Sequence, residues 1–413
     1  MILYYIFVLS LAFVDHPWFG LGFGGITVEK IVGAAALLYA IVHLVLRADR
    51  PAFLDTWPAR AFLVFFLVQW GSYLAFGAKA RADQAFVFHP FNFLLLMFMT
   101  ISVVDSMRRL RWALLAAVGS VAWASLYMLR EWQGGIRAYG YGYRPGYVVG
   151  DPNYFASSAL LCLPLAFYFS RSISQRWIRR GCMASVLLIL AGITVSASRG
   201  GFLGMMVAAV MMVWHSKRRV RTFIGMGVLL GAFLVVSPSS PLDRLLHPSR
   251  SDEGAMDMRT TLWGAAWRMF CDNPLTGVGY GNFRYNSAQY FPEGTTGTNH
   301  LVHNQYLELL AQTGLPGLLS YAAMFVASFV TLNRVRRTAQ RSGSPLLADA
   351  ALGIQIGLAG FSASVFFLSA GFLRLYWFMI SISACLPALA AGEASKQKRR
   401  RLRATQRSLV GAA

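Results

Sequence analysis

The sequence predicts an all-α, polytopic integral membrane protein of about twelve transmembrane helices, with a partly helical loop on the outer face. Three observations support this fold class. The 413 residues are 56% hydrophobic and 13% charged, whereas a soluble domain has roughly 25% charged residues. Apolar runs of about 17–25 residues, each long enough to cross a bilayer, recur along the whole chain. Clusters of arginine and lysine follow alternate runs, as they do in multi-pass membrane proteins.

The apolar runs give the expected spans in order. The first run follows Met1 with no basic segment and no small-residue cleavage site, so we expect no cleavable signal peptide. We treat residues 1–413 as a single transmembrane domain. The spans are predicted near 2–14, 27–46, 60–78, 86–104, 111–129, 153–170, 181–197, 200–215, 221–237, 305–332, 346–368 and 372–391.

Basic residues set the expected orientation. By the positive-inside rule the segments rich in arginine and lysine are cytoplasmic, and so are both termini. The segment 393–413 is a basic cytoplasmic tail that can lie on anionic lipid headgroups. Because this topology accounts for the net charge of +21, we do not expect nucleic acid as a partner. The basic segments lie near 47–60, 108–111, 171–180, 217–221, 334–341 and 396–407.

Two long loops face outward, at about 130–152 and 238–304. The second loop is the largest hydrophilic region and the expected home of the chemistry. Asp257 is placed to cap a helix from Met258 to Phe270, which Asp272-Asn273-Pro274 would end. Trp263, Trp267 and Phe270 share one face of that helix, which favours a position along the membrane interface or against the bundle.

His303 is the principal catalytic candidate. His303-Asn304 stands at the mouth of an apolar helix that runs on through Gly314 and Gly317. An ionisable group at a membrane boundary is costly and therefore indicates function, and an imidazole can exchange a proton near neutral pH. Asn304 is a possible substrate-binding neighbour, and Gln305 and Glu308 could help to orient the ring. The alternative is an inert polar residue at a helix start.

Two arginines are the candidates for binding an anion. Arg199 lies in the tight outward turn Ser198-Arg199-Gly200-Gly201, where exposed N–H groups and a guanidinium fork suit a phosphate. Arg259 is expected in the first turn of the loop helix, where the N-terminal N–H groups also attract anions. For Arg259 a salt bridge to Asp257 or a headgroup contact is the alternative.

Four further residues are weaker candidates for substrate binding. Arg144 could extend the anion site, and Asp151 or Asn153 could bind sugar hydroxyls, although a turn and a helix start explain most of this segment. Arg374 lies in the outward turn before the last span.

Other chemistries are less favoured. Residues 277–283 are glycine-rich but follow no strand, so they predict a turn near a ligand or another helix rather than a dinucleotide site. His300 and His303 lack an HExxH pattern, and we expect neither a metal nor a cofactor. Few acidic pairs are present, which disfavours two-carboxylate glycoside hydrolysis.

Taken in order, these motifs resemble the O-antigen ligase/polymerase superfamily of bacterial envelope glycosyltransferases. The matching motifs lie close together from about residue 145 to 320, and elsewhere the resemblance is limited to the overall architecture of the chain. The matching elements are His303-Asn304 with Gly314 and Gly317, Ser198-Arg199-Gly200, Arg259 with Trp263, the stretch 273–279, and Asp151-Pro152-Asn153.

The resemblance implies a GT-C-type, metal-independent transferase of a Gram-negative inner membrane with a periplasmic active site. Arg199 and Arg259 would hold the diphosphate of an undecaprenyl-diphosphate-linked glycan, a groove between spans would admit its polyprenyl chain, and His303 would activate an acceptor hydroxyl that displaces the diphosphate with inversion. Lipid A–core is the favoured acceptor, as in O-antigen ligation. A polymerase, a protein O-oligosaccharyltransferase, a transporter or lipid flippase, and a non-catalytic scaffold are the alternatives.

Overall fold

The computed structural model describes residues 1–13, 22–23, 26–46, 55–77, 88–139, 143–146, 151–236, 250–292 and 301–410. Within these ranges the chain is helical except for its connections and one short hairpin, in which β1 (Gly22–Phe23) pairs antiparallel with β2 (Ile26–Thr27). The predicted all-α class is therefore confirmed. Helices satisfy their own backbone hydrogen bonds, which is what an apolar chain in a bilayer requires.

A helix coincides with each expected span. Seven helices in the described part of the chain are long and apolar enough to cross a membrane, and α5 and α9 are shorter apolar helices. The protein is thus a multi-pass membrane protein, whereas the number of twelve crossings stays a prediction. The helices are α1 (Ile2–Ser10), α2 (Val28–Val45), α3 (Trp57–Phe76), α5 (His89–Val103), α6 (Met107–Tyr139), α7 (Pro152–Ser172), α8 (Arg176–Ser196), α9 (Arg199–His215), α10 (Arg219–Val236), α14 (Gln305–Arg341), α15 (Pro345–Ser364) and α16 (Arg374–Val410).

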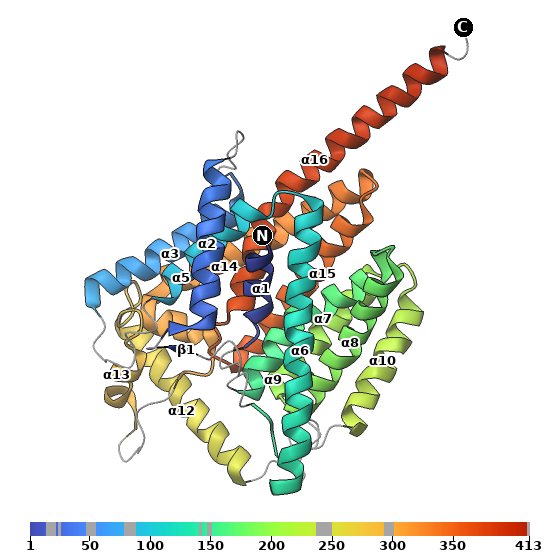
Figure 1. Ribbon diagram of the computed structural model, residues 1–413. Coiled ribbons are helices and arrows are strands. Elements are labelled where there is room, and N and C mark those ends of the chain that lie inside the picture. Colours follow the sequence, from blue (N-terminus) through green and yellow to red (C-terminus); the bar gives the residue numbers. More distant parts are fainter. Residues whose placement is uncertain are drawn as a thin grey trace.

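Three helices are longer than the spans predicted for them. Helix α6 continues to Tyr139 and so takes up part of the expected loop 130–152. Helix α14 continues through its basic end to Arg341, and α16 runs unbroken from Arg374 into the basic tail as far as Val410. Figure 1 shows this last part of α16 projecting from one end of the bundle.

The remaining helices lie in segment 238–304, which is predicted to face outward, or pack against it, and we call this part the outer region. They are α12 (Arg250–Asp272), α13 (Phe283–Ser287), η3 (Ala288–Tyr290) and, after α15, η4 (Val365–Phe367). In Figure 1, α12 and α13 lie at the end of the bundle away from the projecting C-terminal part of α16. Within 238–304 the structure describes residues 250–292 and 301–304, so His300 lies outside the described residues.

The predicted start of the loop helix is wrong. Helix α12 ends at Asp272 as expected, but it begins at Arg250, so Asp257 is inside the helix and does not cap it. Arg259 therefore lies in about the third turn and not at the N-terminus.

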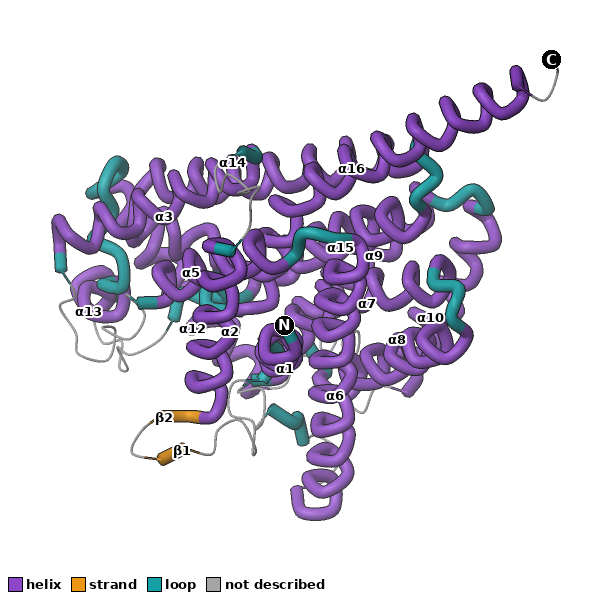
Figure 2. The backbone as a smooth tube through the Cα atoms, turned by 45° about the horizontal axis from the view of Figure 1, so that its top comes forward, coloured by secondary structure: helices purple, strands orange, loops and turns teal. Residues whose placement is uncertain are grey.

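In the described part of the chain, α7 and α15 share the most extensive contact between two helices, and α9 packs against both (Figure 2). The residues at the contact points are glycines, and because they have no side chain the helix backbones can approach each other closely. A Cβ on Gly357 would lie 2.7 Å from the Leu161 carbonyl oxygen, and one on Gly204 would overlap the carbonyl of Gly360. These contacts fix the three helix ends that face the outer region.

The glycine-rich segment 277–281 docks on a break in α14. Gly314 has φ 63° and ψ −162°, which interrupts the helix. Main-chain groups of the segment bond to the break: Val278 N–H donates to Ala311 O at 2.9 Å, and Gly279 N–H donates to Gln312 O at 3.0 Å. The interpretation of this segment as a turn close to another helix is confirmed.

Replacing Gly204 by valine should disturb the packing of α7, α9 and α15. The added side chain would overlap Gly360 and Leu160, and overpacking of this kind costs about 1–3 kcal/mol. We expect a melting temperature several degrees lower for the detergent-solubilised protein in a thermal-shift assay. Gly181→Val is the matched control, because a Cβ on Gly181 of α8 meets nothing within 4 Å. Equal melting temperatures of the two variants would contradict the packing role.

Candidate functional site

Four of the predicted site residues line one polar pocket, which we call the arginine pocket. Arg144, Asn153, Arg199 and Arg259 reach it from four separate segments of the chain. Its volume is about 40 Å³, enough for a small polar group. The other lining residues are Ser157, Ala197, Ser198, Gly200, Ser364, Phe367 and Leu368.

The turn between α8 and α9 positions Arg199. Ala197 ends α8 in the left-handed conformation with φ 46°, and Ser198 caps α9 by accepting the Gly201 N–H at 3.1 Å. Arg199 is the first residue of α9, and Gly200 brings the first turn against the carbonyl of Ser364. The N-terminus of α9 thus lies at the pocket, where its N–H groups and dipole favour an anion.

Arg144 connects the ends of α7 and α8 at the pocket. Its Nε donates to Ser196 O at 3.0 Å, and its Nη2 donates to Asn153 Oδ1 at 3.1 Å. Asp151 caps α7 by accepting the N–H of Asn153 at 2.7 Å, which holds Asn153 in place. The geometry gives Asp151 a capping role beside the pocket, and its binding of sugar hydroxyls stays a prediction.

Helix α12 carries Arg259 to the pocket. One turn further on, Trp263 Nε1 donates to Val302 O at 3.1 Å, and its ring lies 5.8 Å from the ring of Phe366. Trp263 therefore faces the bundle, whereas Trp267 is 52% exposed, so the predicted aromatic face is divided. Since Arg259 is not in the first turn of α12, it contributes its own guanidinium and not a helix N-terminus.

His303 lies beside the arginine pocket but does not line it. Its N–H donates to the hydroxyl of Ser369 at 3.0 Å, and Ser369 follows Leu368 of the pocket wall. His303 has φ 55°; Ala197 is the other non-glycine residue with positive φ in the described part of the chain. Such strained backbone is found most often at functional sites.

Asn304 is buried and caps α14. Its Oδ1 accepts the N–H groups of Tyr306 and Leu307 at 3.0 and 3.1 Å. Gln305, the next residue, accepts the Ala370 N–H at 2.9 Å. These bonds tie the start of α14 to the segment after α15, and a role for Asn304 in substrate binding stays a prediction.

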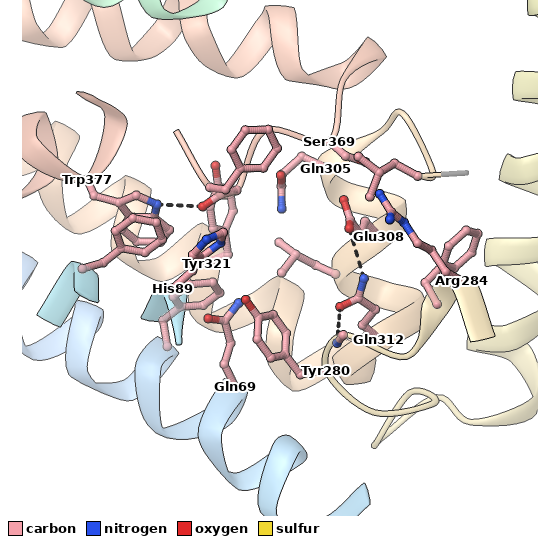
Figure 3. A pocket seen from close by; sticks show the side chains of 18 residues that line it. Gln69, His89, Tyr280, Arg284, Gln305, Glu308, Gln312, Tyr321, Ser369 and Trp377 are labelled. Atoms are coloured by element: carbon pink, nitrogen blue, oxygen red, sulfur yellow. Dashed lines mark hydrogen bonds between the residues drawn. The ribbon is translucent and has the colours of Figure 1, made fainter. Parts of the chain in front are cut away.

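A second cavity, the aromatic–amide pocket, adjoins Ser369 on the other side (Figure 3). It has a volume of about 60 Å³ and combines stacked aromatic rings with amide and carboxylate groups. No sequence pattern identified Gln69 or Tyr280 as a site residue. Gln69 lies in the span α3, and Tyr280 lies in the glycine-rich turn 277–281. Its lining includes Phe65, Gln69, Phe93, Tyr280, Gln305, Glu308 and Trp377.

Glu308 and Gln312 order one wall of this pocket. Gln312 Nε2 donates to Glu308 Oε1 at 3.0 Å, and Gln312 Oε1 accepts the Gly281 N–H at 2.8 Å. Burial raises the pKa of the Tyr280 hydroxyl, and the Glu308 carboxylate raises it further. Tyr280 is therefore a neutral hydrogen-bonding group at physiological pH.

A third, mainly apolar cavity of about 690 Å³ lies among α1, α2, α5 and the start of α7. We call it the apolar cavity; it shares His89, Phe93 and Phe372 with the aromatic–amide pocket. Arg374 lines this cavity and not the arginine pocket. Its guanidinium pairs with Glu29 and donates to the carbonyl of Phe13, so it joins three distant segments.

Metal ligands do not gather at these pockets. No group of three or more His, Cys, Asp or Glu that could hold a metal ion occurs among the residues that the structure describes. The expectation that no metal is needed stays a prediction.

Residues 184–322 match a protein family described as O-antigen ligase. The O-antigen ligase of Salmonella typhimurium (strain LT2) is 25% identical to this chain over 179 residues. The aligned region is 40% of this chain and 44% of that relative, so the chain spans less than half of the length of the curated relative it matches. The family match includes Arg199, Arg259 and His303, whereas Arg144 and Asn153 precede it.

The arginine pocket should bind inorganic pyrophosphate. A hydrogen bond to a charged group contributes about 1.5–3 kcal/mol, so Arg199→Ala and Arg259→Ala should each weaken binding by about tenfold to a hundredfold. Calorimetry on the purified protein at low and high salt measures this. Arg180→Ala, in a basic segment at the far end of α8, should bind like the unmodified protein. Unchanged affinity in both pocket variants would rule the site out.

Proposed function

We propose that this chain, whose residues 184–322 match the O-antigen ligase family, is a member of the O-antigen ligase/polymerase superfamily that transfers a glycan from undecaprenyl diphosphate to an acceptor hydroxyl. The reaction takes place at the periplasmic face of the inner membrane, with both termini in the cytoplasm. It inverts the anomeric centre and needs neither a metal nor a cofactor.

The observation that carries this proposal is the convergence of three arginines on one small polar pocket. Arg144, Arg199 and Arg259 come from different segments and meet at the N-terminus of α9. A diphosphate leaving group gains negative charge as it departs, and guanidinium groups with helix N–H donors stabilise that charge. A fixed array of such donors lowers the barrier without reorganisation during the reaction.

His303 supplies the base in this proposal. An incoming hydroxyl must lose a proton, and an imidazole has a pKa suited to accept it near neutral pH. The backbone bond to Ser369 holds His303 next to the wall of the arginine pocket. Acid–base assistance of this kind contributes about 10²–10⁴-fold to a rate.

The apolar cavity is the proposed site for the polyprenyl chain. At about 690 Å³ it is within the size range of pockets that bury most of a ligand, and apolar side chains dominate its lining. Tyr154, which lines it, is the neighbour of Asn153 in the arginine pocket. The cavity and the arginine pocket thus have neighbouring residues of α7 in their linings, which supports this placement of the lipid.

Lipid A–core is the acceptor that we propose, which makes the reaction an O-antigen ligation. The matched relative bears the name O-antigen ligase, and this similarity supports the choice. Another repeat unit or a protein serine or threonine would use the same donor site, because the arginine pocket contacts only the leaving group.

His303→Ala and Arg199→Ala should each reduce transfer at least about a hundredfold, because one loses the base and the other a charge partner of the diphosphate. The measurement is the initial rate at which purified protein in lipid converts undecaprenyl-diphosphate glycan and lipid A–core into product.

Arg180→Ala is the control, because Arg180 belongs to a basic segment at the cytoplasmic end in the proposed topology. It should retain the unmodified rate. If both site variants insert, fold and transfer as fast as the unmodified protein, the proposed function is wrong.

A further inference from the structure

The aromatic–amide pocket contains the groups that a sugar ring requires. Trp377 stacks with Phe65 and with Phe93, with ring centroids 5.6 and 4.8 Å away and interplanar angles of 21° and 16°, so the three rings form an apolar wall of the pocket. An apolar wall suits the C–H groups of a pyranose, and amide and carboxylate groups bind its hydroxyls. In Figure 3, Gln69 and Tyr280 face Gln305 and Glu308 across a common space.

Gln69 is the residue that distinguishes a binding site from ordinary packing. Its side chain is only 6% exposed, it lines the pocket, and its amide forms no hydrogen bond with another residue in the described ranges. The Gln69 amide atoms are not among the fully buried polar atoms that lack a partner, so they open into the pocket, where the hydroxyl groups of a ligand can bond to them. An amide offers both an acceptor and two donors, which matches neighbouring hydroxyl groups.

The size and charge of the pocket also fit a sugar. About 60 Å³ holds roughly four or five water molecules, which is the size of one sugar ring. Glu308 and Arg284 carry opposite charges in the lining of this pocket, whereas the charged groups in the lining of the arginine pocket are three guanidinium groups, which favour an anion. The diphosphate and a neutral polyol are therefore directed to different pockets.

The two pockets lie on opposite faces of one extended segment. Leu368 has φ −154° and ψ 136°, and in extended backbone successive side chains point to opposite sides. Leu368 lines the arginine pocket, and Ser369 lines the aromatic–amide pocket. His303 is bonded to Ser369, and Gln305 two residues later also lines the second pocket.

We propose that the aromatic–amide pocket binds the sugar ring of the acceptor that carries the reacting hydroxyl. This rests on the proposed function. The acceptor oxygen forms a bond to the anomeric carbon while the bond from that carbon to the diphosphate oxygen breaks. The electron pair leaves with the diphosphate towards the arginine pocket, and the hydroxyl proton passes to His303. Inversion requires attack from the side opposite the leaving group, which the two faces of segment 368–369 provide.

Gln69→Leu tests the assignment. The substitution keeps the side-chain size and removes a buried amide without a partner, so the melting temperature should not fall. We expect the KM for lipid A–core to rise about tenfold, in line with the loss of one or two hydrogen bonds, and the KM for the donor to stay unchanged. Gln355→Leu, a buried glutamine of α15 that lines neither pocket, should change neither KM.

Direct binding measurements distinguish the proposed sugar subsite from the proposed transfer function. Saturation-transfer NMR measures the binding of lipid-free core oligosaccharide, and calorimetry measures the binding of inorganic pyrophosphate. Gln69→Leu should weaken oligosaccharide binding and keep pyrophosphate binding, and Arg199→Ala should do the reverse. Gln69→Asn, which retains the amide, should bind oligosaccharide better than Gln69→Leu, and it replaces the leucine variant if that fails to fold.

If Gln69→Leu binds oligosaccharide as tightly as the unmodified protein and keeps its acceptor KM, the sugar subsite is refuted while the proposed transfer stands. If no variant of the arginine pocket affects pyrophosphate binding or transfer, the proposed function itself fails.

Discussion

The close contact of α7, α9 and α15 is the constraint on which the candidate site depends. Because glycines let these backbones touch, the outer ends of the three helices meet at one place, where Ser364 donates a hydrogen bond to Ser157 at 2.9 Å. Asn153 and Arg199 lie on two of those ends, and Arg144 links Asn153 to the end of α8 that precedes Arg199. A displacement of about 1 Å can reduce a reaction rate a hundredfold, so the spacing of these helices decides whether the guanidinium groups can act on one ligand.

Much of the fold and part of the site could be predicted from the sequence. The helices were predictable because a bilayer leaves no alternative for an apolar chain of this length, and their local signals agree with the structure. Arg199 was identifiable because a charge and two glycines directly follow the two-residue connection between α8 and α9. Arg144, Asn153 and Arg259 join it in the pocket, although the reason given for Arg259, a position in the first helical turn, was wrong.

What the sequence could not provide depends on contacts between distant segments. Arg374 was read as a candidate ligand, but it pairs with Glu29, which is more than 300 residues away in the chain. Gln69 looked like one polar residue in an apolar span, and only the docking of α14 and α16 against α3 turns it into part of a pocket. Asn304 fits a substrate contact and a helix cap equally well in sequence, and the structure shows the cap.

The docking of segment 277–281 on the break in α14 has a consequence for biogenesis. Synthesis proceeds from the N-terminus, so α3 and this segment leave the ribosome before α14 exists. The bonds of Tyr280 N–H to Ser72 and of Asn282 to the Gly77 carbonyl join residues more than 200 positions apart, and the bonds to Ala311 and Gln312 must wait for α14 to insert. Assembly of this region is therefore a late, post-insertion event, completed only when α14, at the start of the last quarter of the chain, has entered the membrane.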